Sequence, residues 1–181
     1  AVPVARAELQ LVGVACMLVA SKFEDVHPPA VDEFVYISDN TYLRDEVLQM
    51  EGALLSRLEF NLSVVTAVPF LRRYARLAQV GAAQADPTIA ALASYLLELT
   101  LQEYAFLKYR PSERAAAALW LAMYTARLPC WTPAMEAATG YAARQLHECA
   151  AELRTVSRNA ESHSLQAVGA KSSHAKNLCV S

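Results

Sequence analysis

Two segments of the chain, 7–22 and 115–124, are apolar at almost every position. The first contains the run LVGVACMLVA and the second is AAAALWLAMY, and neither has a regular polar face. A helix that is apolar on all sides is buried by neighbours all around it. The pattern therefore predicts two central helices, each surrounded by other helices.

The segments beside these two helices alternate apolar and polar residues with a helical period. The clearest is 88–101, where apolar residues follow the i, i+3, i+4, i+7 spacing of an amphipathic helix. We expect Thr88 to cap this helix, residues 38–41 to supply N-cap oxygens to the helix 42–58, and Pro111 to lie in the first turn of the helix 111–124. The expected helices are 7–22, 30–37, 42–58, 67–79, 88–101, 111–124, 134–139 and a long one ending near 157.

The same order of elements follows both apolar helices: a Pro-bearing break, a short helix and a long helix. One constant offset aligns the two copies and pairs apolar residues along their whole length. Two diverged copies of one helical unit are the simplest explanation. We expect the tail, 159–181, to be extended or frayed. The aligned pairs are Tyr42 with Tyr141, Val47 with Leu146, Met50 with Cys149, and Leu54 with Leu153.

Composition agrees with an all-α fold. The chain has 181 residues, 55% of them hydrophobic, and only five Gly. Few Gly residues disfavour hairpin-rich β folds, and no Gly-rich phosphate loop occurs. The longest apolar run, 11–20, is too short to cross a bilayer and is not preceded by the basic segment of a signal peptide. We expect a soluble intracellular protein.

The net charge bears on the expected partners, and the cysteine spacing bears on the expected redox compartment. The net charge is −2, and the only basic cluster is Arg72, Arg73 and Arg76, so we expect no nucleic-acid partner. The four cysteines show no C-x-x-C spacing, which favours a reducing compartment without disulfides or zinc. They are Cys16, Cys130, Cys149 and Cys179.

Enzyme signatures are absent from the sequence. It contains no H-E-x-x-H and no G-x-S-x-G motif. His147 and Cys149 are two residues apart and so do not share a helix face. We expect no catalytic residue, no metal ligand and no cofactor.

One residue breaks the local pattern. Glu51 falls near the centre of the apolar arc of the helix 42–58, where removing a charge from water costs several kcal/mol unless a partner compensates. Lys22 is the best nearby cation. Two interpretations stay open: an internal Lys22–Glu51 salt bridge, or the polar lining of a partner-binding groove. The apolar walls of such a groove would be Val19, Phe23, Leu55, Phe60 and Leu62.

Long stretches of the chain resemble the cyclin box of mitotic cyclins. In the first half these are LQLVG (9–13), ASKFED (20–25), the Pro pair 28–29, FVYISDNTY (34–42) and Met50-Glu51. The resemblance continues through LRR (71–73), YLLELTLQEY (95–104), Pro111-Ser112, WTP (131–133) and SHAK (173–176). It covers essentially the whole chain, and its last pieces favour the B type over the A type.

The resemblance implies an all-α pair of tandem cyclin folds, each a five-helix repeat. It also implies a non-catalytic regulatory subunit that binds and activates a cyclin-dependent protein kinase at the transition into mitosis, in the nucleus and cytoplasm. Lys22 and Glu51 match the pair that hydrogen-bonds the kinase backbone beside its movable helix αC. Val19, Phe23, Leu55 and Leu62 match the pocket for an apolar side chain of that helix, and Phe60 matches a neighbouring contact.

Leu9 and Gln10 match part of the groove by which such cyclins dock substrates or inhibitors with a basic-x-Leu motif; alternatively, they are simply exposed helix residues.

The family's first two box helices are missing, so we expect a chain truncated at its N-terminus, with core surface exposed along 11–20 and poor solubility. The expected domains are 1–62, a partial N-terminal box; 63–158, a C-terminal cyclin fold; and the tail 159–181.

The alternative function is a cyclin-fold adaptor of the transcription-factor type, which binds nucleic acid or another protein. It would use the basic cluster at 72–76. No residue pattern supports an all-α enzyme, and none indicates a membrane partner.

Overall fold

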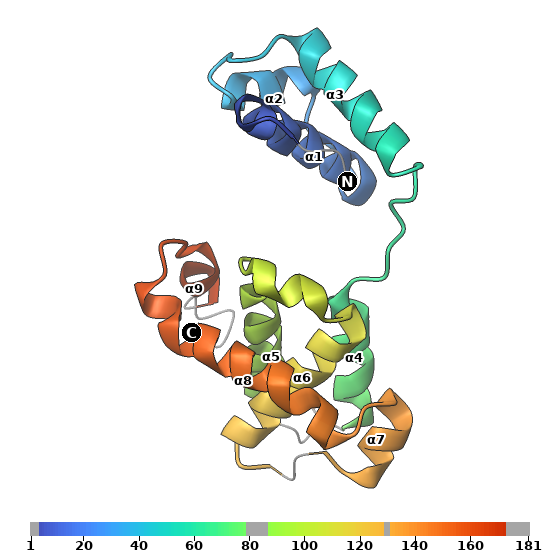
Figure 1. Cartoon of the computed structure of the whole chain (residues 1–181), viewed down its shortest axis with the longest axis vertical. Coiled ribbons are helices and arrows are strands. Elements are labelled where there is room, and N and C mark those ends of the chain that lie inside the picture. The colour runs from blue at the N-terminus through green and yellow to red at the C-terminus, as the bar shows by residue number, and fades with distance from the viewer. Residues whose placement is uncertain (1–3, 79–86, 129–130, 173–181) are drawn as a thin grey trace. The chain divides into compact units, whose positions relative to one another are not determined.

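The computed structural model describes residues 4–78, 87–128 and 131–172, and within these ranges every regular element is helical. The chain divides into two compact units, Ala1–Val64 and Val65–Ser181. Figure 1 shows the helices of each unit. The all-α prediction is confirmed.

The first unit contains three α-helices in its described residues: α1 (Leu9–Glu24), α2 (Val31–Ile37) and α3 (Arg44–Arg57). A 3-10 turn, Arg6–Glu8, leads into α1. Both α1 and α2 pack against α3, and the small core is built from Leu18, Phe34 and Val47. Each of the three helices contributes one of these side chains.

The prediction that α1 is buried all around is wrong within this unit. Only Ala15, Leu18 and Val19 of α1 are buried, while Met17 is 59% exposed and Cys16 is also at the surface. The physical reason is that α2 and α3 cover one face of α1, and no other described helix of the unit packs on it. The free face of α1 therefore exposes side chains of core type.

The second unit is built around α6 (Pro111–Thr125), which packs against α4 (Ala67–Leu77), α5 (Pro87–Leu99) and α8 (Ala143–Asn159). A 3-10 turn, Tyr104–Lys108, precedes α6, and α7 (Pro133–Thr139) packs on α4. Residues 115–119 of α6 are completely buried. The prediction of a buried central helix is confirmed here, with Pro111 at its first turn.

The described part of the expected tail, 159–172, is not extended. A 3-10 turn, Ala160–Ser162, follows α8, and α9 (Ala167–Ser172) packs on α5. Lys171 bonds both carboxylate oxygens of Glu98 at 2.8 and 2.9 Å, and Ser172 is buried. The sequence of this segment has little helical periodicity, so it did not predict the short helix α9, which contacts with α5 stabilise. Residues 173–181, with the SHAK stretch, lie outside the described part.

The groups that cap the helix N-termini differ from those expected from the sequence. Residues 38–41 end α2 instead of capping the next helix, which begins at Arg44, and Thr88 lies inside the first turn of α5. At the start of three helices, the side chain of the third helical residue accepts a hydrogen bond from the backbone N–H of the residue just before the helix. The pairs are Ala30 N–Glu33 Oε1 (3.1 Å), Leu43 N–Glu46 Oε2 (2.7 Å) and Ala142 N–Gln145 Oε1 (2.8 Å).

Three helices end with a non-glycine residue in the left-handed region, which usually favours glycine. These are Asp39, Glu59 and Arg127, with φ of 58°, 51° and 56°. At the end of α6, the Arg127 N–H donates to the Tyr124 carbonyl at 3.1 Å, and the Leu128 N–H donates to the Met123 carbonyl at 3.0 Å. This pairing closes the helix but places a long side chain where a Cβ is unfavourable.

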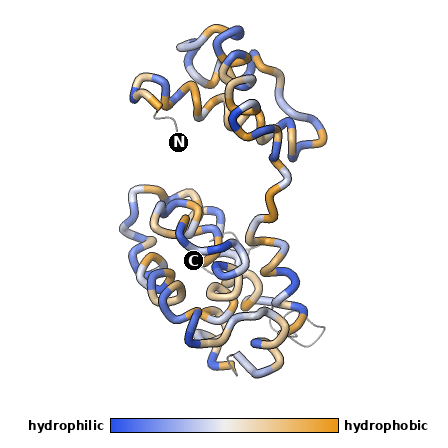
Figure 2. Tube along the Cα trace, turned by 45° about the vertical axis from the view of Figure 1, so that its right-hand side comes forward, coloured by the Kyte–Doolittle hydropathy of each residue, from blue (hydrophilic) through white to orange (hydrophobic). Residues whose placement is uncertain are grey.

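The internal repeat predicted from sequence appears as the matching order α1–α2–α3 and α6–α7–α8. Val47 and its aligned partner Leu146 are both completely buried. Cys149 and Leu153 are also buried, whereas Met50 and Leu54 are only partly so, because more helices cover the second copy. Figure 2 shows hydrophobic and hydrophilic residues alternating along the helices of both units.

Leu119→Ala should lower the free energy of unfolding of the second unit by about 2–5 kcal/mol, because it leaves a cavity at a completely buried position. Urea unfolding followed by circular dichroism measures the change. Leu107→Ala, at a position that is 67% exposed, is the control and should shift it by less than about 0.5 kcal/mol. Equal effects of the two variants would contradict the assigned core.

Native alkylation should distinguish two cysteines. Burial raises the pKa of the Cys149 thiol to about 12, so almost no thiolate exists there near neutral pH, whereas Cys16 is exposed. Iodoacetamide followed by peptide mass spectrometry should label Cys16 in the folded chain and Cys149 only after denaturant is added. Labelling of Cys149 at the rate of Cys16 would show that α8 is not packed as described. Cys130 and Cys179 lie outside the described residues.

Candidate protein-binding site on the first unit

A bidentate salt bridge joins α1 to α3. Lys22 Nζ lies 2.7 Å from Glu51 Oε1 and 2.9 Å from Oε2. The Glu51 side chain is 13% exposed, while that of Lys22 is 43% exposed. The pairing expected from sequence is therefore present, and it lies at the edge of the helix interface with Lys22 facing solvent.

Local helix geometry places both charges. Lys22 lies in the last turn of α1, where the helix dipole favours a cation, and Glu51 lies in the middle of α3. An ammonium group carries three N–H donors, and two contacts go to Glu51, so at least one donor remains for another acceptor. The carboxylate likewise retains lone pairs for an incoming N–H.

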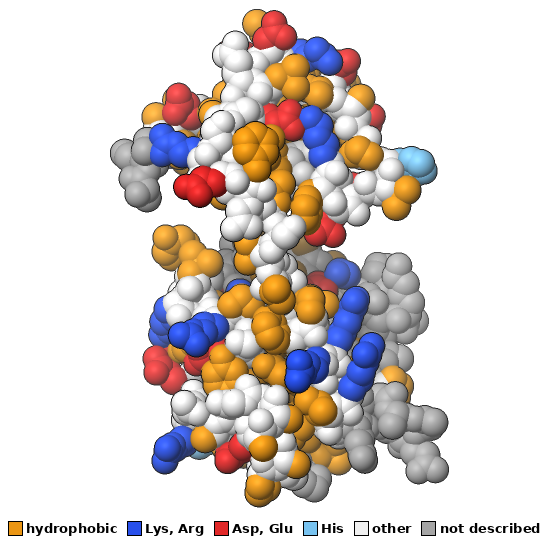
Figure 3. Space-filling view, turned by 90° about the vertical axis from the view of Figure 1, so that its right-hand side faces the viewer, with side chains coloured by type: hydrophobic (Ala, Val, Ile, Leu, Met, Phe, Trp, Pro, Cys, Tyr) orange, Lys and Arg blue, Asp and Glu red, His pale blue; other side chains and the backbone are white. Residues whose placement is uncertain are grey.

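Apolar side chains flank the salt bridge on both helices. Val19 shares a face of α1 with Lys22 and with Phe23, since it lies three residues before the first and four before the second, and Leu55 lies one turn beyond Glu51 on α3. Val19 is buried, Leu55 is partly buried and Phe23 is half exposed. Hydrophobic side chains are visible on the surface of this unit in Figure 3.

The chain that leaves α3 adds two more apolar residues. The Phe60 N–H donates to the Leu55 carbonyl at 2.9 Å, and the Leu62 N–H donates to the Phe60 carbonyl at 3.1 Å. These bonds turn the backbone at the end of α3, next to Leu55, and leave Phe60 70% exposed. The apolar residues expected at this site thus come from the C-terminal half of α1, from α3 and from the segment that follows α3.

Leu9 and Gln10 lie at the opposite end of α1 from Lys22. Leu9 is 57% exposed, and the Gln10 side chain accepts a hydrogen bond from the Tyr42 hydroxyl at 3.3 Å. They belong to a separate surface from the Lys22–Glu51 pair. Their exposure fits both alternatives that the sequence left open.

In residues 4–78, 87–128 and 131–172, no group of His, Cys, Asp and Glu could hold a metal ion. No helix of the described chain is long and apolar enough to cross a membrane. Arg72, Arg73 and Arg76 are exposed on α4 and line a depression of about 410 Å³ together with Pro69 and Leu77.

The sequence did not reveal a larger depression of about 700 Å³ in the second unit. Three arginines line it: Arg127, just after α6, and Arg154 and Arg158 on α8. Their sequence signal was weak, because only the spacing of four between Arg154 and Arg158 places two of them together. Tertiary packing alone brings Arg127 to the same cavity.

Both units match sequence profiles of one family. Residues 1–63 match "Cyclin, N-terminal domain" and residues 65–181 match "Cyclin, C-terminal domain". Among solved structures, the X-ray structure of a viral cyclin from Herpesvirus saimiri superposes with a TM-score of 0.70 at 21% identity, over 84% of this chain and 67% of the viral one. The fold is thus two tandem cyclin-box domains.

Curated relatives carry A-type cyclin names. Cyclin-A2-4 of Arabidopsis thaliana is 42% identical over 93% of this chain, and Cyclin-A1 of Homo sapiens is 44% identical over 98%. The chain spans 37% of the length of each. The chain belongs to the cyclin family. These names give no support to the expected preference for the B type.

Lys22→Met should lower the free energy of unfolding by about 1–2 kcal/mol, because it leaves the mostly buried Glu51 carboxylate without its cation. Adding Glu51→Leu should recover most of the loss, and urea unfolding measures both. Arg44→Met, which breaks the exposed Arg44–Asp32 pair (3.4 Å), is the control and should cost less than about 0.5 kcal/mol. A double variant no more stable than Lys22→Met would contradict this account of the pair.

Proposed function

We propose that this chain is a regulatory subunit that binds and activates a cyclin-dependent protein kinase and acts at the G2/M transition. The observation that carries the proposal is the Lys22–Glu51 salt bridge, with the half-exposed Phe23 and the partly buried Leu55 on the same two helices, in a chain of the cyclin family. Membership of this family and the A-type names of the relatives support a role in the cell cycle.

The proposed contact uses both charges at once. Lys22 donates to backbone carbonyls of the kinase beside its helix αC, and Glu51 accepts from backbone N–H groups there. Hydrogen bonds to charged groups are stronger than neutral ones, so a partly buried pair at the edge of an apolar surface fixes the register of the partner. Val19, Phe23, Leu55 and Leu62 accept an apolar side chain from the same kinase helix, and Phe60 packs beside it.

Activation then follows from a population shift. A protein kinase is active when the αC glutamate is drawn into its ion pair with the β3 lysine. A partner that binds the inward position of αC better than the outward one moves the equilibrium towards the active state by its difference in affinity. The cyclin chain itself needs no catalytic group, metal or cofactor for this, and we propose that it is not an enzyme.

Three finer assignments form part of the proposal. Leu9 and Gln10 belong to a docking surface for substrates or inhibitors that carry a basic-x-Leu motif, and the exposure of Leu9 suits an apolar contact. The complex works in the nucleus and cytoplasm. Within the mitotic cyclins, the SHAK stretch (173–176) suggests B-type features on a chain whose named relatives are of the A type.

Lys22→Ala combined with Glu51→Ala should weaken binding to a cyclin-dependent kinase by at least about tenfold, since it removes charge-assisted hydrogen bonds at the interface centre. Co-purification and a histone phosphorylation assay measure binding and activation. The matched control is Lys171→Ala with Glu98→Ala, which removes another bidentate Lys–Glu pair, with distances of 2.8 and 2.9 Å, from the second unit.

The control variant should bind and activate the kinase like the unmodified chain. Circular dichroism shows whether both variants are folded. Unchanged kinase binding by a folded Lys22/Glu51 double variant would refute the proposed interface.

A second candidate is an adaptor that binds nucleic acid or another protein through α4. Its support is that Arg72, Arg73 and Arg76 are exposed around one depression. Salt-dependent DNA binding near physiological ionic strength, lost on Arg72→Gln with Arg76→Gln, would favour it. The net charge of −2 opposes it, and we therefore place kinase regulation first.

A further inference from the structure

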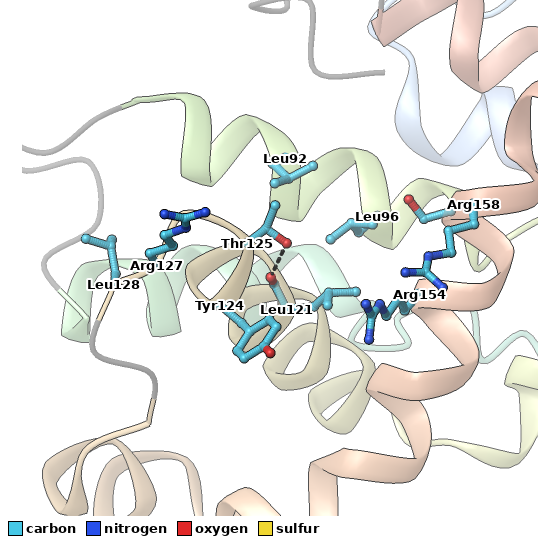
Figure 4. Close-up of a pocket in the computed structure, with 10 residues that line it drawn as sticks. Leu92, Leu96, Leu121, Tyr124, Thr125, Arg127, Leu128, Arg154 and Arg158 are labelled. Carbon is cyan, nitrogen blue, oxygen red and sulfur yellow. Dashed lines mark hydrogen bonds between the residues drawn. The ribbon is translucent and has the colours of Figure 1, made fainter.

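The 700 Å³ depression of the second unit is formed by three helices. Leu92 and Leu96 come from α5, Leu121 and Tyr124 from α6, and the arginines come from the end of α6 and from α8. Figure 4 shows Arg127 at one end of this depression and Arg154 with Arg158 at the other, with leucines and Thr125 between them. The floor is therefore apolar and both ends are cationic.

Among the described residues that line the depression, none is acidic. Within the described part of the chain, Arg127, Arg154 and Arg158 form no salt bridge, although Glu148 and Glu152 on the same helix α8 are both bonded to Lys108. Arg154 and Arg158 are like charges at a spacing of i, i+4, which destabilises a helix by a few tenths of a kcal/mol. Three guanidinium groups that form no ion pair with a described residue thus line one cavity.

Arg127 is also unfavourable for the backbone. It adopts a φ of 56° after the end of α6, a position where glycine avoids the steric cost of a Cβ. The cost of a non-glycine residue in this region is of order 1 kcal/mol. An arginine here weakens the helix end and supplies a positive charge to the cavity.

We propose that this depression binds an acidic peptide segment, in which carboxylate side chains flank one aliphatic or aromatic residue. The apolar residue packs on Leu92, Leu96 and Leu121, while the carboxylates on either side reach the arginines at the two ends. Guanidinium groups pair with carboxylates through two parallel hydrogen bonds, which gives direction as well as affinity. This site is separate from the Lys22–Glu51 pair and does not depend on kinase binding.

The apolar floor favours this occupant over a polynucleotide. A sugar-phosphate backbone would leave the leucine floor without an aliphatic partner. An extended peptide advances ~3.3 Å per residue with side chains on alternate sides. It can therefore place one apolar residue on the floor and acidic residues at both ends.

Fluorescence anisotropy with the full chain tests the proposal. The probe is a labelled ten-residue peptide with a central Leu flanked by Glu on both sides. We expect saturable binding that weakens with added salt, and at least about tenfold weaker binding when the central Leu is replaced by Ser or each Glu by Lys. Binding that ignores either replacement overturns the proposal.

Arg154→Gln with Arg158→Gln should raise the Kd of the peptide by at least about tenfold. The matched control, Arg72→Gln with Arg76→Gln, removes the same charge from α4 and should leave the Kd within about twofold. Equal weakening by both variants would show only a general charge effect. Tighter binding of a phosphoserine peptide or an oligonucleotide by tenfold or more would also overturn the carboxylate assignment.

Arg127→Gly separates a binding role from a structural one. Because glycine suits the left-handed position, this variant should be more stable in urea by a measurable shift of the midpoint, while its Kd for the peptide rises several-fold. A more stable variant with unchanged Kd would remove Arg127 from the site. Full loss of binding on Arg154→Gln with Arg158→Gln alone, with no change on Arg127→Gly, would refute the two-ended geometry.

Discussion

The second unit depends on the close approach of helices to α6. Residues 115–118 are alanines that are completely buried, so α4, α5 and α8 can each pack near its axis. The distance between packed helices is set by the side chains at the contact, and small residues shorten it. The larger side chains of the neighbours, such as Leu71, Leu96 and Leu153, then fill the remaining space. This packing positions the end of α6 and the exposed turns of α8, and with them the arginine-lined depression.

The two repeats share a helical plan but carry different surface chemistry. The offset that pairs Val47 with Leu146 also pairs Glu51 with Ala150. Ala150 is buried in the core of the second unit. A carboxylate could not occupy that position without a partner, since a buried unpaired charge costs several kcal/mol. The charged pair therefore exists only in the first copy, where α1 is left partly open. The second copy instead carries its charges at helix ends and on the outer turns of α8.

Both candidate sites place a polar group where stability alone would not choose it. Glu51 interrupts the apolar arc of α3 and is held by Lys22, and Arg127 occupies a backbone position that favours glycine. In the first site Lys22 neutralises Glu51 within the same unit. The sequence reveals this site because Glu51 is a charged residue within an apolar helical pattern. In the second site the arginines have no ion-pair partner among the described residues, and the sequence shows no break in the apolar pattern there.

The sequence by itself determined the helical class, the repeat, most helix boundaries and the Lys22–Glu51 pair, because apolar periodicity and a misplaced charge are local signals. Tertiary structure decided the features that depend on contacts between residues distant in sequence. It left α1 exposed on one face while burying α6, since among the described α-helices three pack against α6 and two against α1. It also replaced the expected N-caps and folded residues 167–172 into a helix on α5. Finally, it brought Arg127 to the cavity of Arg154 and Arg158, because residues far apart in sequence meet only through packing.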